Sequence, residues 1–451
     1  MNKLFAGFAR VNVTPVMGTG MPGYFNPRFA EGVLDELEIN ALALSCGETK
    51  AVLLSMDNEG IKREIVTEFR KYISELTDIP EECIFIHATH THTGGNLVKD
   101  SANKFEREYY QDVYYKMADA TRLAVQDLKP ARMGYGTGTA PNIAFLRRFR
   151  MKDGSIQTNP GVDNPDILEP MGQVDEQVGV LRIDREDAET IVLVSFACHP
   201  DTVGGCKISA DWPGFLCRTI ETTLEKTKCI FFNGAEGDVN HVNVHPAGGD
   251  LNDMFMDFDD VSRGYGHARY MGRVVAGGVL QVYDKVKYTE ADQIRCLQRT
   301  VSVPSNMPKP EELPEARRID ALHRAGRDEE IPFSGMMLTT VVAEADRMLR
   351  LEHGPKNFEM ELSGIAIGDA VLVGIPGEPF NGIGRELKKA KGWGIVMPTC
   401  LTNGHQGYFP MMDAYREGGY EARSSNFRAG AAELLIREGL DLLRDIKIGD
   451  C

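Results

Sequence analysis

The chain has 451 residues, of which 42% are hydrophobic and 26% charged, and its formal net charge is −16. These proportions are typical of a globular protein and exclude disordered, collagenous and disulfide-framework classes. The acidic balance disfavours a nucleic acid or an anionic membrane surface as the main partner, because neither attracts a negative protein surface. We therefore expect a small-molecule substrate, no nucleic-acid partner and no stable membrane association.

The amino-terminal residues lack a sustained apolar segment and a small-residue cleavage site, so we expect no secretory signal. No window approaches the roughly 18 to 20 continuous apolar residues of a membrane span. The nine cysteines are scattered and form no CxxC pair, which favours reduced thiols in a cytoplasm over a disulfide set. A monomer and a homo-oligomer both fit these features.

Short apolar runs alternate with amphipathic patterns along the chain. Runs rich in Val, Ile and Phe predict strands over residues 37–46, 50–56, 83–89, 190–198, 228–233, 358–367 and 370–375. Apolar residues spaced three and four apart predict helices over residues 60–76, 105–128, 211–226, 262–286, 311–325, 335–353, 381–391 and 427–445. This alternation predicts an α/β protein with mixed β-sheets flanked by helices.

Residues 303–333 are strongly charged and bounded by prolines, as is typical of a surface excursion or of a joint between subdomains. The alternative, a solvated helix between two halves of one domain, fits the same pattern, and no other segment resembles a linker. We therefore predict a single catalytic domain over residues 1–451 with a charged helical excursion at about 303–333.

Polar residues gather where four predicted strands run into glycine-bearing loops, the position at which α/β folds bind ligands. The first of these ends, residues 84–95, carries His90 and His92, and two rings spaced two apart on an extended segment point to one side. The other ends carry His199 and Asp201, then Glu236, Asp238, Asn240, His241 and His245, and finally Glu378. Each motif alone also fits an ordinary loop or turn, but together they predict a catalytic zinc site.

A HxH pair also opens the amidohydrolase barrel and the metallo-β-lactamase motif. The amidohydrolase pair lies near the start of the chain, whereas this pair begins at residue 90. The metallo-β-lactamase motif continues as HxHxDH, whereas the present sequence continues as His92-Thr93-Gly94. Both assignments are therefore disfavoured.

Taken in order, the motifs resemble the catalytic domain of the neutral ceramidase family, zinc-dependent amidases that release a fatty acid from an amide-linked lipid. The matching segments are GFARVNVTPV near the amino terminus, MPGY, MD, ATHTHTGG, FLRRF, FACHP, SADWPG, GAEGDVN, IPGEPF and NGHQGYFPMMDAYREGGYEA. The resemblance spans nearly the whole chain in collinear order, which makes it more specific than any single motif.

The resemblance implies that one zinc ion is bound by His90, His199, Glu378 and Tyr408. Two imidazoles, a carboxylate and a phenolic oxygen are acceptable ligands for zinc and for other divalent transition metals. An open coordination position would remain for water or substrate.

Four further roles follow from the same resemblance. His92 is expected to transfer a proton or to hydrogen-bond beside the metal. Arg147 and Tyr420 are expected to donate to an oxyanion or a substrate carbonyl. Asp57 is expected to orient a ligand.

The departures from the family bear on the substrate. The ceramidase loop GDVSPN contains the nucleophilic serine, whereas Asn240 occupies that position here and cannot form an acyl-enzyme. We therefore expect a zinc-activated water to attack directly, with Asn240 as a hydrogen-bonding group. We also expect neither the signal sequence nor the immunoglobulin-like domain of secreted ceramidases. A polar or modestly acylated small molecule is therefore expected in place of membrane ceramide.

The leading hypothesis is a cytoplasmic zinc-dependent hydrolase that cleaves a C–N amide bond of a small N-acyl compound. One alternative is a metal-dependent lyase, isomerase or hydrolase that acts on a carbohydrate derivative, with Asn240, His241 and His245 binding hydroxyl groups. Another is a binding protein that keeps the fold without turnover. A second metal and a different divalent ion both remain compatible with these residues.

Overall fold

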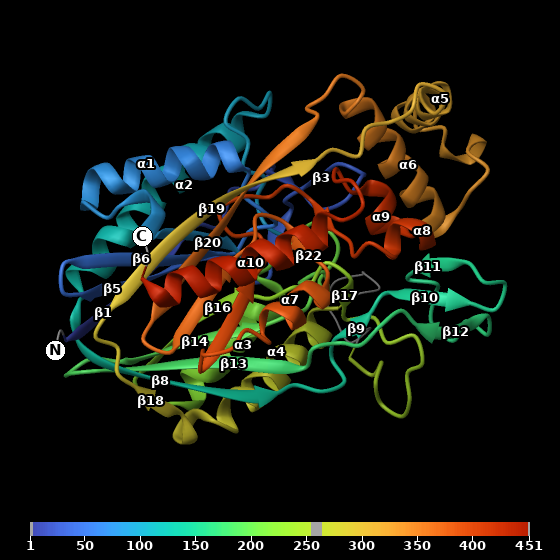
Figure 1. Ribbon diagram of the computed structural model, residues 1–451. Helices are drawn as coiled ribbons and strands as arrows, with labels where there is room; N and C mark the ends of the chain where they lie inside the picture. Colours follow the sequence, from blue (N-terminus) through green and yellow to red (C-terminus); the bar gives the residue numbers. More distant parts are fainter. Residues whose placement is uncertain (1–2, 254–263, 450–451) are drawn as a thin grey trace.

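The computed structural model describes residues 3–253 and 264–449. Its largest element is a mixed nine-stranded sheet in the order β16-β14-β13-β8-β1-β5-β6-β7, with β18 paired to β8 (Figure 1). The strands are β1 (Leu4–Asn12), β5 (Glu38–Cys46), β6 (Thr49–Met56), β7 (Ile84–Ala88), β8 (Lys129–Thr139), β13 (Gln177–Arg185), β14 (Thr190–Phe196), β16 (Thr227–Asn233) and β18 (Lys287–Thr289).

The two ends of this sheet curl toward each other. The backbone N–H of Asn233 in β16 donates to Nε2 of His87 in β7 at 2.9 Å. The Ser55 hydroxyl in β6 donates to the carbonyl oxygen of Phe231 at 2.5 Å. Because β7 runs parallel to β6 and β16 runs parallel to β14, the carboxyl ends of these strands open into one region.

A second sheet packs face to face against the first. It has the order β19-β20-β21-β23, with β21 parallel to β23. Its buried residues Ile365, Leu372 and Met397 belong to the same core cluster as residues of the first sheet. The strands are β19 (Ile294–Pro304), β20 (Asn357–Ile367), β21 (Ala370–Gly374) and β23 (Ile395–Thr399).

Helices cover the outer faces of both sheets. The second helix contacts β1 and β5, and the first packs on the second and on β7. The next two pack on β8, β13 and β16, and the carboxy-terminal helix packs on β19 and β20 (Figure 1). Their apolar stripes at helical spacing account for this burial. The helices are α1 (Arg63–Thr77), α2 (Lys104–Gln126), α3 (Asp211–Thr223), α4 (Tyr265–Leu280), α7 (Asn381–Leu387) and α10 (Ala431–Ile448).

The predicted charged excursion corresponds to a pair of helices with a small core of their own. This core includes Ala316 and Ile319 of α5 (Leu313–Arg324) and Val342 and Ala345 of α6 (Gly335–Arg350). The pair lies at one end of the molecule beside α9 (Tyr420–Ser424) (Figure 1). The excursion predicted over 303–333 thus covers the end of β19 and all of α5, and α6 extends the helical part to Arg350.

Several short elements connect the larger ones. They are β2 (Gly20–Met21), β3 (Arg28–Phe29), β4 (Gly32–Val33), β9 (Phe145–Leu146), β10 (Arg148–Met151), β11 (Ile156–Thr158), β12 (Ile167–Pro170), β15 (Lys207–Ile208), β17 (Val239–Asn240), β22 (Glu378–Pro379), β24 (Tyr408–Phe409) and α8 (Ala414–Glu417).

The fold class expected from the sequence is confirmed, since mixed sheets are flanked by helices. Each predicted strand and helix is present with shifts of a few residues at its ends, and the first two residues of the helix predicted over 262–286 lie outside the described part. None of the helices in the described ranges is both long and apolar enough to cross a membrane. The eight cysteines of the described ranges are free thiols.

Candidate metal centre

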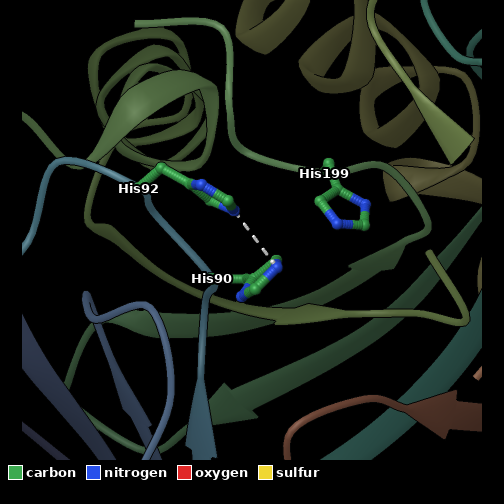
Figure 2. A group of neighbouring side chains, drawn as sticks. All are labelled: His90, His92 and His199. Carbon is green, nitrogen blue, oxygen red and sulfur yellow. Dashed lines mark hydrogen bonds between the residues drawn. The ribbon is translucent and has the colours of Figure 1, made fainter. Parts of the chain in front are cut away.

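The predicted polar residues converge where the strands end. His90 and His92 follow β7, His199 follows β14, and Glu378 follows β21, each a few residues beyond the last paired residue. Figure 2 shows the rings of His90, His92 and His199 gathered around the same space. The collinear motifs therefore form one buried cluster.

His90 and His199 have the tautomer that metal ligands use. The ring Nδ1 of His90 lies 2.6 Å from the carbonyl oxygen of Glu59, and Nδ1 of His199 lies 2.9 Å from that of Glu236. A carbonyl oxygen can only accept, so Nδ1 carries a proton in both rings, and in the neutral form of each ring Nε2 has the lone pair. Backbone carbonyls thus orient both rings before any ion binds.

The two Nε2 atoms face a carboxylate. Glu378 Oε2 lies 3.4 Å from Nε2 of His90 and 3.2 Å from Nε2 of His199. With Nδ1 protonated, these atoms are all acceptors, and the arrangement is favourable only if a proton or a cation lies among them. Burial opposes protonation of His90, but Glu378 and Glu236 raise its pKa to about 9. The residues present therefore fit a divalent cation.

The backbone of His90 supports the same interpretation. Its φ angle is 77°, a left-handed conformation that is uncommon for a residue with a side chain. The backbone N–H of His90 donates to the carbonyl oxygen of Asn58 at 2.8 Å, which holds this conformation. Such local strain is typical of functional positions.

His92 lies on the cavity side of the cluster. Its Nε2 is 3.3 Å from Nε2 of His90 (Figure 2), and its Nδ1 is 3.8 Å from Asp201. Burial lowers the pKa of His92 to about 3, so the ring is neutral near pH 7. The MPGY segment covers it, and a Cβ at Gly23 would lie 2.5 Å from Nδ1 of His92, so only glycine fits there.

A second carboxylate, Glu236, joins the cluster. Two sets of side chains could hold an ion, one formed by His90, His92 and His199, the other by His90, His199, Glu236 and Glu378. Within each set the ligand atoms lie within 4.8 Å of one another. Glu236 was noted in its loop from the sequence but was not predicted as a ligand.

Tyr408 and Arg147 lie beside His199. The ring of Tyr408 is nearly parallel to that of His199, with centroids 6.4 Å apart. The Arg147 guanidinium lies 5.4 Å from the Tyr408 ring centroid, and one of its nitrogens is 3.5 Å from Nε2 of His199. The Tyr420 ring lies 5.7 Å from that of Tyr408. The structure therefore places the predicted ligand Tyr408 and the predicted donors Arg147 and Tyr420 together.

Asn240 is hydrogen-bonded to neighbouring loops. Its amide nitrogen donates to Oδ1 of Asn159 at 3.0 Å, and its amide oxygen accepts from the backbone of Val242 at 3.0 Å. Asn240 is not part of the lining of the cavity described below. A hydrogen bond from Asn240 to an attacking water stays a prediction.

Asp57 contacts the loop that carries the histidines and not the histidines themselves. Its carboxylate accepts from the backbone of Glu38 at 3.0 Å and lies 3.3 Å from the hydroxyl of Thr89, next to His90 in the chain. It forms no hydrogen bond to an imidazole in the described part of the chain. Its contact with Thr89 supports the loop that carries His90, and a role in orienting a ligand stays a prediction.

Asp57 predicts a pH dependence of stability. Burial, and then the charge of Glu38, raise its pKa from 3.8 to about 8. Because the folded pKa is raised, the stability that Asp57 contributes is complete below about pH 4 and is lost as the pH rises to about 8. As the pH rises from 5 to 8, the melting temperature of the wild type should therefore fall relative to that of Asp57→Asn. A difference that stays constant over this range would contradict the assignment.

Two further residues of the site, His405 and Glu59, were missed from the sequence. His405 Nε2 lies 3.3 Å from Glu378 Oε1, and its Nδ1 lies 3.5 Å from Glu59. Burial opposes the charged ring, but Glu59 and Glu378 raise the pKa of His405 well above its usual value. An imidazolium thus holds the second oxygen of Glu378, so that the first faces the two histidines. The available signal was the position of His405 in the same motif as Tyr408.

The cluster forms the floor of a cavity of about 370 Å³. Its walls are aromatic and polar, and its rim includes two charged residues of α6, Asp346 and Arg350. A cavity of this size holds a small molecule. The residues that line it include Tyr24, Phe25, His92, Tyr408, Tyr420 and Asn426.

The fold is that of solved neutral ceramidase structures. The chain aligns over 100% of its length with 75% of the neutral ceramidase chain from Pseudomonas aeruginosa, with a TM-score of 0.75 and 15% identity. It aligns equally completely with 76% of a ceramidase chain complexed with C2, with a TM-score of 0.73 and 16% identity. No protein-family model matches the chain, and no curated protein sequence matches it significantly. The neutral-ceramidase-like architecture predicted from the motifs is thereby confirmed.

Proposed function

We propose that the protein is a zinc-dependent hydrolase that cleaves a C–N amide bond of a small N-acyl compound. The observation that carries this proposal is the convergence of Nε2 of His90, Nε2 of His199 and Oε2 of Glu378 at the floor of a cavity. In this proposal Tyr408 is a further candidate ligand. The ceramidase fold supports the reaction class, because the site occupies strand ends of that fold.

The side chains around the cluster have the properties that amide hydrolysis needs. When bound, zinc would lower the pKa of a water molecule and polarise the substrate carbonyl. His92 lies beside His90 and lines the cavity, where it can hydrogen-bond to the attacking water and pass a proton to the leaving amine. Arg147 and Tyr420 can donate to the oxygen on which negative charge develops.

Attack by water follows from the same geometry. Asn240 carries no nucleophile and its amide is used in a turn away from the cavity. No acyl-enzyme is therefore proposed, and the reaction would proceed in one displacement.

Metal analysis and a hydrolysis screen test the proposal together. Mass spectrometry of the purified protein should find about one divalent transition metal per chain, as expected for a three- or four-ligand site. A panel of N-acyl amino acids, N-acyl sugars and short-chain N-acyl amines should contain a substrate whose hydrolysis is lost on chelation and restored by Zn²⁺. A metal-free protein, or turnover that survives complete chelation, would rule the proposal out.

The alternative of a carbohydrate-acting lyase, isomerase or hydrolase keeps one favourable observation. The rim of the cavity carries Asp346, Arg350 and Asn426, which can bind hydroxyl groups. Asn240, His241 and His245, on which this alternative was first based, do not line the cavity. Turnover of sugar derivatives that lack an N-acyl group would favour it.

We also propose a cytoplasmic location. The support is that no disulfide joins the eight described cysteines, five of which have buried thiols that a reducing compartment would keep reduced: Cys46, Cys83, Cys198, Cys229 and Cys400. Fractionation of the native host with an antibody to the chain would test it.

Arg350 is expected to bind the polar part of the substrate. It lines the cavity, and its guanidinium is held by Asp346 at 2.7 Å and by Oδ1 of Asn426 at 3.1 Å. A hydrogen bond from a charged donor contributes about 1.5–3 kcal/mol when buried, and about half of this side chain is exposed, so Arg350→Ala should raise KM about tenfold with kcat nearly unchanged.

The matched control for Arg350 is Arg324→Ala in α5. Arg324 pairs with Asp320 four residues earlier at 2.8 Å, as Arg350 pairs with Asp346, but it lies away from the cavity. Equal KM values for the two variants would show that Arg350 does not contact the substrate.

A further inference from the structure

Glu236 is a buried carboxylate that has no role in the reaction proposed above. It lies in the loop after β16 and is 0% exposed. Neither of its oxygens accepts a hydrogen bond in the described part of the chain. Its neighbouring donors are its own backbone N–H and the thiol of Cys400, which is a weak donor. An ionised carboxylate in such surroundings is strongly unfavourable unless a proton neutralises it or a cation compensates it.

The loop fixes this carboxylate at the cluster. The backbone carbonyl of Glu236 accepts from Nδ1 of His199 at 2.9 Å, so one residue orients a ligand and directs its own side chain to the same point. The next residue packs tightly, since Gly237 donates to the carbonyl of Pro379 at 2.8 Å and a Cβ on it would lie 2.5 Å from the carbonyl of Glu378. The two carboxylate-bearing loops are thus held together.

Glu236, like His199, lies outside the lining of the cavity, whereas His92 and Tyr408 belong to it. Its carboxylate lies within 4.8 Å of the ligand atoms of His90, His199 and Glu378. Since His90 and Glu378 also line the cavity, an ion held by these four residues would be accessible to water or substrate from there.

From this geometry we infer that Glu236 is a direct metal ligand, so that the ion is bound by His90, His199, Glu236 and Glu378. This inference rests on the metal site of the proposed function. Two imidazoles and two carboxylates match the charge of a divalent first-row transition metal such as Zn²⁺, Mn²⁺ or Fe²⁺. His92 and Tyr408 then remain free to contact the substrate.

Metal affinity measures this role directly. Metal-free full-length protein is titrated with Zn²⁺ in competition with a chromophoric chelator. Glu236→Gln should weaken Zn²⁺ binding at least about a hundredfold, beyond the 10- to 100-fold typical of groups that only support a ligand. Glu59→Gln is the control, because Glu59 is a partly buried acid of the site that contacts His405 and belongs to neither candidate ligand set. The Zn²⁺ affinity of Glu59→Gln should change less than that of Glu236→Gln.

Cobalt substitution and metal-free stability distinguish a ligand from a structural acid. The visible absorption of the Co²⁺ form should shift in Glu236→Gln and stay unchanged in Glu59→Gln. Without metal, Glu236→Gln should melt at or above the wild-type temperature, because an uncompensated buried carboxylate has been removed. If the glutamine variant does not fold, Glu236→Asp keeps the charge, withdraws it by one methylene and should show the same loss of affinity.

The outcomes separate this inference from the proposed function. If Glu236→Gln binds Zn²⁺ like the wild type and gives the same Co²⁺ spectrum, Glu236 is not a ligand, while the proposed function stands. If the wild type binds no divalent metal, both fail.

Discussion

His90→Ala is expected to lose the bound metal and at least about a thousandfold of kcat/KM. The substitution removes the Nε2 atom that lies 3.4 Å from Glu378 Oε2, while the carboxylates of the cluster remain. Metal polarisation of a substrate is worth several kcal/mol, and about 4 kcal/mol corresponds to a factor of about a thousand in rate. Metal content by mass spectrometry and kcat/KM on the same preparation measure both effects.

The variant should fold, since the loop has other supports. The backbone N–H of His90 still reaches the carbonyl of Asn58, and that of Thr89 reaches the carbonyl of Met56. The matched control is His267→Ala, which removes a buried imidazole that contacts Asp253 and lies outside both candidate ligand sets. His267→Ala should keep its metal. Retention of a full equivalent of metal by His90→Ala would contradict the assignment of the site.

Much of the fold could be predicted from local pattern. Strands such as β6, β7 and β16 are short and apolar and end at polar residues, and the long amphipathic helices α2 and α10 repeat at helical spacing. Strand β8 was not predicted, because its segment Lys129–Thr139 contains three glycines and few apolar residues. Its pairing with β13 over nine positions supplies the stability that local propensity does not.

Only part of the site could be predicted from the sequence. His90 and His199 stand at strand ends, which is a local signal, and the resemblance to a family supplied Glu378 and Tyr408. Glu236 and His405 could not be assigned in this way, because their role depends on distances between loops far apart in the chain. The contact of Asn240 with Asn159 was not predicted for the same reason, since it depends on a short strand pairing between distant segments.

Arg147→Ala is expected to lower kcat about 10²–10³-fold with little change in KM and with the metal retained. The guanidinium lies 3.5 Å from Nε2 of His199 and over the Tyr408 ring, where an oxyanion would develop. Removal of one such donor costs this factor in other hydrolases. A fall in kcat without a rise in KM indicates an interaction made in the transition state.

The same substitution also affects stability. Arg147 is paired with Glu421 at 2.6 Å, and Glu421 is 0% exposed. Removal of one partner of a buried ion pair costs about 3–5 kcal/mol, because the other charge is left uncompensated. Arg147→Ala alone would therefore confuse a chemical role with a structural one.

The double variant Arg147→Ala with Glu421→Gln separates the two roles. Neutral glutamine no longer needs a cation and can still accept from the Thr158 hydroxyl, which lies 3.0 Å from Glu421. The double variant should recover most of the melting temperature lost by Arg147→Ala, while its kcat stays low. If kcat returns together with stability, Arg147 only holds Glu421 in place. If kcat stays about a hundredfold down in a stable, metal-loaded protein, the guanidinium acts on the reacting groups.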